Sequence, residues 1–436
     1  MLLYYARIAW VSILSNWFLS LLMVTAVGLG IGVCMTIVTV NYIMGSDPIP
    51  NKSSELFYVQ MDSWDPNDAF REPNEPPNQL TYLDAMALMT AGQASRQTAS
   101  SAASLILELD QPDLKPFIAS ARTGFADFFP MFDVPFLYGS GWSKAEDDAR
   151  SQVIVLSKET NERIFGGENS VGRTLRASGH TFTVVGVIDD WGPVPKFFDI
   201  TTGPFNEVED VFVPFNLIVE LELSRSGNTN CWKPSADGFV AFLNSECIWI
   251  QFWAELPTAA EQEAYLSYLD AHVMQQKELG RFQRPLNNRI SDVNAWMENQ
   301  RVVQDEAQIM LVVAVMFLFV CLLNTIGLLL SKFLGRSQEI GLRRALGASK
   351  ATLFAQYMIE SAMIGVAGGV LGLILTWVGL RGLEGLFGDF IANLVTLDWV
   401  MVASAIVLAI AASLLAGFYP TWRACNVAPA AQLKAQ

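Results

Sequence analysis

Four long apolar runs constrain this chain more than any other feature of its sequence. Between Arg7 and Asp47 there is no charged residue, and residues 17–44 are almost wholly apolar. Three similar runs follow at residues 309–330, 362–380 and 399–419. Each is close to the roughly 20 residues that a helix needs to cross about 30 Å of hydrocarbon. Because core helices of soluble proteins seldom reach such lengths without a charge, the runs predict four membrane spans.

The composition agrees with a membrane protein. The mean hydropathy is +0.31, and only 16% of residues are charged. The first apolar run is longer than the apolar part of a secretion signal, and no small-residue cleavage pattern ends it. We therefore expect an uncleaved anchor, preceded by an interfacial helix over residues 1–16.

The basic residues predict which side of the membrane each segment occupies. Loops rich in lysine and arginine stay in the cytoplasm. The segment after the second span has one acid, Glu339, and five basic residues: Lys332, Arg336, Arg343, Arg344 and Lys350. The tail is also basic, whereas the short loop after the third span is acidic. Both termini and the 332–354 segment are therefore expected inside, as in a multi-pass protein of the bacterial inner membrane.

These runs and charges together predict the organisation of the chain. It consists of a cytoplasmic interfacial helix (1–16), span one (17–44), a periplasmic α+β domain (45–305), span two (306–331), a cytoplasmic segment (332–354), span three (355–381), a short periplasmic loop (382–398), span four (399–420) and a cytoplasmic tail (421–436).

The exported insert is strongly acidic. It holds 19 of the 28 basic and 37 of the 43 acidic residues, which gives a net charge of −18. Such a domain should be soluble and should repel nucleic acid rather than bind it. Strand-like runs such as ECIWIQFWAEL alternate in it with helix-like runs such as TAAEQEAYLSYLDAHVMQQKELG, which is typical of an α+β domain.

No catalytic or metal-binding constellation stands out in the insert. The stretch GENSVGRTL at 167–175 is close to a phosphate-binding loop, but a helix-like run precedes it and a strand pair follows it. We interpret its glycines as a turn between a helix and a hairpin. The acidic pairs at 147–148 and 189–190 are expected in solvated turns, and the aromatic run from Trp249 to Trp253 is expected in the core. We predict neither catalysis nor a metal site.

Two cysteines in the insert, Cys231 and Cys247, suggest a disulfide, because the exported compartment is oxidising. Two separately buried thiols are the alternative. In the predicted spans, small residues recur at the four-residue spacing that allows close helix packing. These positions are Gly28, Gly32, Gly365, Gly368, Gly369 and Gly372. The spacing leaves open whether they meet within one subunit or across a dimer.

The cytoplasmic segment GRSQEIGLRRALGASKATL predicts a short basic amphipathic helix and a tight turn into span three. Ser337 is expected to cap the short helix, Gly347 to end it in a left-handed conformation, and Ser349 to cap the next helix. Such a helix could lie on lipid headgroups or fit a groove of a cytoplasmic partner. The spans themselves show no charged residue, and Glu360 lies only at the edge of span three. This argues against an ion-coupled carrier.

The run from Ser337 to Ala348 resembles the signature of FtsX-like ABC permeases, especially the MacB branch. The tail AGFYPTWRA, the start of the insert and FGGENSVGRTL are similar to parts of the same family. The resemblance implies a non-catalytic subunit that transmits the motion of an ATPase to its periplasmic domain. It also implies a coupling helix that contacts the ATPase, formed by Glu339, Ile340, Leu342, Arg343, Arg344, Ala345, Leu346 and Gly347.

The resemblance also implies the partners. Members of the family work as permease dimers with two ATPase subunits, so ATP and Mg belong to the ATPase and no cofactor to the permease itself. Because only about 16 residues precede the first span, the ATPase is expected on another chain. A homodimer and a heterodimer stay open, as do a periplasmic adaptor and an outer-membrane channel. The expected role is efflux of peptides, antibiotics or other amphiphiles. Control of a periplasmic partner such as a cell-wall hydrolase, or lipoprotein release, is the alternative.

Overall fold

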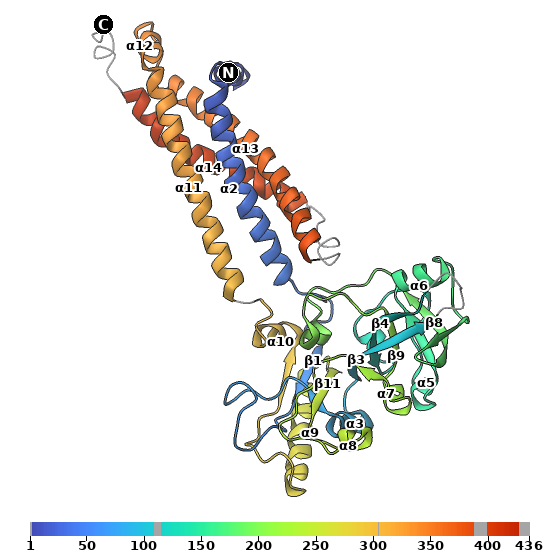
Figure 1. Cartoon of the computed structure of the whole chain (residues 1–436). Helices are drawn as coiled ribbons and strands as arrows, with labels where there is room; N and C mark the ends of the chain where they lie inside the picture. Colours follow the sequence, from blue (N-terminus) through green and yellow to red (C-terminus); the bar gives the residue numbers. More distant parts are fainter. Residues whose placement is uncertain (1, 109–114, 304, 388–398, 427–436) are drawn as a thin grey trace. The chain divides into compact units, whose positions relative to one another are not determined.

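The computed structural model describes residues 2–108, 115–303, 305–387 and 399–426, and it divides the chain into two compact units. One unit combines Met1–Gly45 with Val303–Gln436, and the other is Ser46–Val302. A mixed α/β domain is thus inserted between the first and second long apolar helices, which confirms the predicted fold class (Figure 1). Residues 388–398 and 427–436 of the predicted loop and tail lie outside the described ranges.

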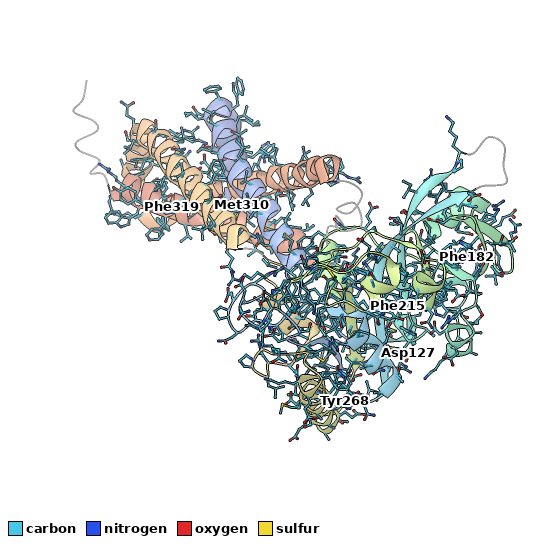
Figure 2. All side chains as sticks on the ribbon, turned by 60° about the horizontal axis from the view of Figure 1, so that its bottom comes forward. Asp127, Phe182, Phe215, Tyr268, Met310 and Phe319 are labelled. Carbon is cyan, nitrogen blue, oxygen red and sulfur yellow. A yellow bond between two sulfur atoms is a disulfide. The ribbon has the colours of Figure 1, made fainter. Side chains whose placement is uncertain are left out.

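All the regular secondary structure in the described part of the membrane unit is helical. Its helices are α1 (Leu2–Ser15), α2 (Trp17–Met44), α11 (Asp305–Gly335), α12 (Ser337–Ala345), α13 (Lys350–Phe387) and α14 (Trp399–Asn426). Four of them, α2, α11, α13 and α14, are long and apolar enough to cross a membrane. Met310 and Phe319, labelled in Figure 2, belong to the apolar side chains that α11 exposes, as expected for a surface that faces lipid.

Helix α13 packs against α2 through glycines on both helices. A methyl group added at Gly368 would lie 2.7 Å from Val27, and one at Gly372 would lie 2.9 Å from Ile31. On the facing helix, a methyl group at Gly28 would lie 2.9 Å from Leu371, and one at Gly32 would also meet α13. Non-bonded carbon atoms cannot approach so closely. Only glycine, which has no side chain, therefore fits at these positions.

The remaining two glycines of the set face another helix. Methyl groups added at Gly365 and Gly369 would meet Ser413 and Ala409 of α14 at 2.8 Å and 2.9 Å. Helix α13 therefore packs closely on two neighbours, α2 and α14. In this structure all six glycines lie at contacts within a single chain.

The extramembrane unit is built on one mixed sheet of twelve strands in its described part. The main strand order is β12-β1-β11-β3-β4-β9-β6-β8-β5, and β2, β7 and β10 pair beside this path. The strands are β1 (Leu56–Gln60), β2 (Leu80–Thr81), β3 (Arg96–Glu108), β4 (Phe117–Gly124), β5 (Phe136–Gly139), β6 (Val153–Leu156), β7 (Thr174–Ala177), β8 (His180–Ile188), β9 (Val211–Pro214), β10 (Ser224–Arg225), β11 (Ile248–Glu255) and β12 (Arg289–Asp292). Most pairs are antiparallel, but β4–β9 and β6–β8 are parallel.

Helices cover the sheet and close its connections. They are α3 (Tyr82–Ala91), α4 (Phe128–Met131), α5 (Lys144–Asp148), α6 (Lys158–Phe165), the 3-10 helix η1 (Phe197–Thr202), α7 (Asn216–Glu220), α8 (Phe239–Leu243), α9 (Ala259–Glu278) and α10 (Val293–Asn299). Helix α9 lies in the helix-like run TAAEQEAYLSYLDAHVMQQKELG named above. A capping box of Thr258 and Glu261 begins it, and it buries Tyr265, Leu269 and Val273 at four-residue spacing.

Strand β11 joins the two hydrophobic cores of this unit. All eight of its residues are buried, which confirms the prediction that its aromatic residues form core. Phe252 belongs to one core cluster and Trp253 to the other. Successive side chains of a strand point to opposite faces of the sheet, so this central strand contributes to both layers.

The stretch GENSVGRTL is a turn, as predicted. Gly166 ends α6 in a left-handed conformation, and Gly167 and Gly172 also have positive φ angles. The hairpin of β7 and β8 follows directly. The chain therefore lacks, at this point, the strand-to-helix order that a phosphate-binding loop requires.

The expectation that Asp147 is solvated is wrong. Asp147 belongs to α5, and its side chain is buried. Its two carboxylate oxygens accept hydrogen bonds from the Ala126 amide at 2.6 Å and the Trp142 indole at 2.9 Å. Burial raises the pKa of Asp147 to about 7, although these two hydrogen bonds act in the opposite direction. The neighbouring Asp148 is exposed. Asp189 and Asp190 lie in a partly solvated turn beside Lys158.

Arg122 forms the centre of a fully buried charge cluster between β4 and η1. Its guanidinium donates to Asp199 at 2.6 Å and to Glu209, and Lys196 lies 3.2 Å from the same glutamate. Burial alone would raise the pKa of Asp199, but Arg122 and Lys196 lower it to about 2. The cluster links segments that are far apart in sequence, and its charges are paired as buried charges must be.

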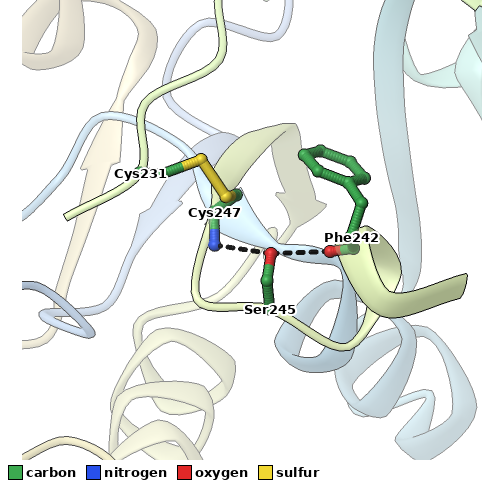
Figure 3. The surroundings of a disulfide bond; sticks show 4 residues. All are labelled: Cys231, Phe242, Ser245 and Cys247. Carbon is green, nitrogen blue, oxygen red and sulfur yellow. Dashed lines mark hydrogen bonds between the residues drawn. A yellow bond between two sulfur atoms is a disulfide. The ribbon is translucent and has the colours of Figure 1, made fainter. Parts of the chain in front are cut away.

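Cys231 and Cys247 form a disulfide in the structure (Figure 3). It joins the segment before α8 to the start of β11. Ser245 supports this turn, since its hydroxyl donates to the Phe242 carbonyl at 2.6 Å and accepts from the Cys247 amide at 3.2 Å. Cys34, Cys321 and Cys425 are buried free thiols of the membrane unit.

Candidate functional site

The segment that joins α11 to α13 is a compact elbow made of α12 and two short turns. Gly347 has a φ angle of +102°, a conformation that few other residues adopt, and it reverses the chain after α12. Ser349 then accepts a hydrogen bond from the Thr352 amide at 3.1 Å and so caps α13. Both features were predicted from the sequence.

The predicted cap at Ser337 is wrong. The capping position belongs to Arg336, and Ser337 is already the first residue of the helix. Only this one residue separates α12 from α11, and the Arg336 carbonyl accepts the first helical hydrogen bond, from the Ile340 amide at 3.1 Å. Because α11 leads so directly into the elbow, no extended residue is available where a serine cap would be needed.

Helix α12 has an inner and an outer face. Ile340 is only 2% exposed and packs into a core cluster with Phe333 of α11 and Tyr357 of α13. In contrast, Leu342 is 58% and Leu346 80% exposed. Ala345, which ends the helix, is exposed as well. The elbow is therefore fixed to the bundle on one side and presents an apolar edge on the other.

Polar contacts also fix the elbow to the bundle. Glu339 and Arg343 form an ion pair at 2.5 Å across one turn of α12. Arg343 further donates to Gln356 of α13 at 3.2 Å, and Arg344 donates to the Cys425 carbonyl of α14 at 3.4 Å. Helix α12 thus contacts both helices that follow it in the chain, so a displacement of α12 must be accommodated by α13 and α14.

A buried ion pair lies beside the elbow, and sequence reasoning missed it. Lys332 Nζ lies 2.7 Å from Glu360 Oε1, and these side chains are 1% and 0% exposed. Ser12 donates to the same glutamate oxygen at 2.7 Å, while Lys332 donates to Ser20 at 3.1 Å. The network joins α1, α2, α11 and α13.

The sequence did not predict that these two charges are buried, because it placed Lys332 after span two and Glu360 at the edge of span three. Helix α11 continues to Gly335, so Lys332 is part of it rather than of the segment after it. Glu360 lies well inside α13, which begins at Lys350. The sequence did contain a signal for this pair, since a basic and an acidic residue each adjoin an apolar run. A charge that is buried at such a position requires an opposite charge beside it.

Arg336 attaches α1 to the elbow. Its guanidinium donates to the hydroxyl of Ser12, to the carbonyl of Ser12 at 3.3 Å and to the hydroxyl of Ser15 at 2.6 Å. Ser12 therefore contacts both Arg336 and Glu360. The N-terminal helix is linked in this way to the buried pair as well as to the elbow.

The described ranges contain no group of three or more histidine, cysteine, aspartate or glutamate side chains that could hold a metal ion. A four-span helical bundle has a large inserted α/β domain and an elbow with one anchored and one exposed face. This arrangement is that of a multi-pass membrane permease.

The family comparisons cover both units. Residues 20–264 match the MacB-like periplasmic core domain, and residues 311–429 match the FtsX-like permease C-terminal domain. The chain belongs to the MacB/FtsX family of ABC-transporter permeases. The second match, over residues 311–429, includes the elbow residues 337–347.

The chain is also similar to curated exporters. It is 22% identical over 386 residues to the pyoverdine export ATP-binding/permease protein PvdT of Pseudomonas aeruginosa, which covers 87% of this chain and 50% of that protein. It is 24% identical over 314 residues to the macrolide export ATP-binding/permease protein MacB of Pasteurella multocida, which covers 71% and 42%. The chain thus spans about half the length of these relatives, or less.

Among solved structures, the periplasmic region of MacB from Actinobacillus actinomycetemcomitans aligns with 58% of this chain and 95% of that structure, at 15% identity and a TM-score of 0.37.

Proposed function

We propose that this chain is the permease subunit of an exporter in which a separate ATPase subunit binds the exposed edge of α12. The observation that carries the proposal is the contrast along this one helix. Ile340 is buried in the bundle, whereas Leu346 projects into solvent. An exposed apolar edge on a short, anchored helix fits a groove of a partner better than it fits water.

The contacts of α12 suggest how motion of the ATPase would be transmitted. Movement of α12 would reach α13 through Ile340 and through the hydrogen bond from Arg343 to Gln356. Helix α13 would pass it to α2 through the glycine contacts at Gly368 and Gly372. Helices α2 and α11 flank the inserted domain in the chain, so any change in their positions acts directly on both of its ends.

The charge pattern supports a location in the bacterial inner membrane, with both termini and the elbow in the cytoplasm and the inserted domain in the periplasm. The elbow and the start of α13 are basic, and the inserted domain is acidic. ATP and Mg would bind to the ATPase, which is active in the cytoplasm. This chain itself would contribute no catalytic group.

The proposed cargo is an amphiphile such as a peptide or an antibiotic. This proposal rests on the relatives named for export of pyoverdine and of macrolides. A second permease would complete the transporter, as a homodimer or a heterodimer. A periplasmic adaptor and an outer-membrane channel are the further partners proposed for the inserted domain.

The ATPase contact can be tested by co-purification. The tagged full chain is expressed with the ATPase encoded nearest to it, in wild-type form and as Leu346→Asp. Since a charge in the apolar contact would be desolvated, we expect the variant to retain less than about a tenth of the ATPase, which corresponds to a loss of more than about 1.4 kcal/mol in binding.

The matched control is Leu279→Asp, which places the same charge at a similarly exposed leucine of the inserted domain. It should retain the ATPase at the wild-type level. Normal retention and normal export by Leu346→Asp would refute the proposed contact, provided that the ATPase binds the wild-type chain. If no ATPase binds the wild type at all, the proposed function itself fails.

A further inference from the structure

A cavity of about 490 Å³ lies between α1 and the elbow within the membrane unit. Side chains of α1, α12 and α13 line it, together with Arg336 between α11 and α12. Figure 1 shows that the N-terminus and α12 lie at the same end of the helical bundle. The cavity therefore opens at one end of the bundle, beside the proposed contact with the ATPase.

The lining of this cavity carries an excess of positive charge. Three guanidinium groups, of Arg7, Arg336 and Arg343, face a single carboxylate, that of Glu339. Glu339 is already paired with Arg343. Among the described residues, neither Arg7 nor Arg336 lies within ion-pair distance of a carboxylate, and the hydrogen bonds of Arg336 go to neutral serines. Neither of these two guanidinium groups thus has a direct ion-pair partner among the described residues.

The position of the cavity matches the headgroup level of a membrane. Tyr4 lines its rim, and Trp10 and Trp17 are exposed on α1 and at the start of α2. Exposed tyrosine and tryptophan side chains concentrate where the apolar part of a spanning helix meets the headgroups. The apolar side chains of Ile8 and Val11 form another part of the wall. A ligand there would meet both guanidinium groups and an apolar surface.

We propose that this cavity binds the phosphate of an anionic membrane lipid such as phosphatidylglycerol. Guanidinium groups bind phosphate oxygens with paired, charge-assisted hydrogen bonds, and basic pockets at the ends of spanning helices take anionic headgroups. The apolar wall favours a lipid over a free phosphate ion. The proposal requires only that the bundle spans a membrane, so it goes beyond the proposed ATPase contact and does not depend on it.

A bound headgroup would bridge two elements of the elbow region. Arg7 belongs to α1 and Arg336 lies between α11 and α12, so one phosphate between them would hold α1 to the elbow. The lipid would then act on the same helix that is proposed to contact the ATPase.

The test is native mass spectrometry of the full-length chain in detergent, titrated with phosphatidylglycerol or with zwitterionic phosphatidylcholine. We expect the wild type to bind phosphatidylglycerol preferentially. Each basic residue near a headgroup contributes about fivefold in affinity, so Arg7→Gln combined with Arg336→Gln should weaken phosphatidylglycerol binding by about 25-fold. Arg7→Lys, which keeps the charge, should retain most of the affinity.

The matched control is Arg423→Gln. Arg423 is an exposed arginine of α14 that does not line the cavity and whose guanidinium contacts the Tyr419 hydroxyl. This variant should bind like the wild type, and the thermal midpoints of all variants should agree, which excludes misfolding. Arg7→Gln alone provides a second reading if the double variant is unstable, since Arg7 is exposed.

Three results would overturn the proposal. Equal binding of the two lipids would show that the phosphate charge is not recognised. An equal loss in Arg423→Gln would show a diffuse surface attraction rather than a site. Displacement of the lipid by millimolar inorganic phosphate would show that the cavity takes a free anion instead.

Discussion

The buried pair of Lys332 and Glu360 allows the sharpest prediction about the stability of the membrane unit. Their charged atoms lie 2.7 Å apart, and both side chains are almost fully buried. At an effective dielectric constant of about 20, such a pair has a gross attraction of about 6 kcal/mol. The cost of removing both charges from water offsets most of this energy, so the net contribution of the intact pair is small.

Removing only one partner should lower the stability, because the other charge then stays buried without an opposite charge beside it. We expect Glu360→Gln and Lys332→Met each to lower the stability of the membrane unit by about 3–5 kcal/mol. For a unit of this size, that corresponds to a decrease in the thermal midpoint on the order of 10 °C. The double variant Lys332→Met with Glu360→Met should recover to within about 1 kcal/mol of the wild type.

The buried thiols of the membrane unit supply the assay. Cys34, Cys321 and Cys425 are buried and free, whereas the two cysteines of the inserted domain are bonded to each other. A maleimide dye that fluoresces on reaction with thiols therefore reports the unfolding of the membrane unit alone. Single variants that melt at the wild-type temperature, or a double variant as unstable as the worse single variant, would show that the two charges do not compensate each other.

Three further predictions concern other parts of the chain. Gly368→Ala should lower the thermal midpoint of the membrane unit in the same assay, because the added methyl group would lie 2.7 Å from the Val27 side chain. The control is Gly327→Ala, whose methyl group meets nothing within 4 Å. It should leave the midpoint unchanged or raise it slightly. For Asp147, the pKa raised by burial to about 7 means that the folded domain binds the proton more tightly than the unfolded chain. The contribution of Asp147 to stability should therefore be greatest below about pH 4 and fall by up to a few kcal/mol as the pH rises through 7. Asp147→Asn should flatten this dependence in urea titrations of the full chain followed by tryptophan fluorescence, and an unchanged slope would contradict the assignment. Reduction of the Cys231–Cys247 disulfide should lower the stability of the inserted domain by about 3 kcal/mol, as expected for the small loop that it closes. Thiol counting by mass spectrometry should show three blocked thiols in the unreduced denatured chain and five after reduction, and five in both would exclude the disulfide.

The spans and the order of the two units could be predicted because their signals are local. A long uncharged run is visible in the sequence by itself, and so are Gly347 after α12 and Ser349 before α13. These residues act through their own backbone or through neighbours a few positions away. The same holds for the long amphipathic helix α9, whose capping box and apolar spacing are both contained in the sequence.

Strand β3 shows where local signals fail. It is the longest strand of the sheet, and its first nine residues read RQTASSAAS, which has few of the β-branched and aromatic residues that favour strands. It forms because it lies between β11 and β4 and pairs with both. Strands that are distant in the sequence determine that this segment is a strand, so its own composition did not predict one.

The candidate site was only half predictable for the same reason. The helix and turns of the elbow are local features, but the anchoring of Ile340 and the exposure of Leu346 depend on how α12 packs against the bundle. The pair of Lys332 and Glu360 depends on the approach of α11 and α13. Asp147 gave no signal because an acidic pair in a polar run is usually solvated, and only the tertiary structure covers it.

The proposed topology puts the elbow in the cytoplasm and the inserted domain outside. Thiol accessibility tests it most directly, with Leu346→Cys in the elbow and Leu279→Cys in the inserted domain, both at highly exposed positions. In intact spheroplasts, a membrane-impermeant maleimide should label the Leu279→Cys chain at once and the Leu346→Cys chain only after permeabilisation. Labelling of Leu346→Cys in intact spheroplasts would contradict the account.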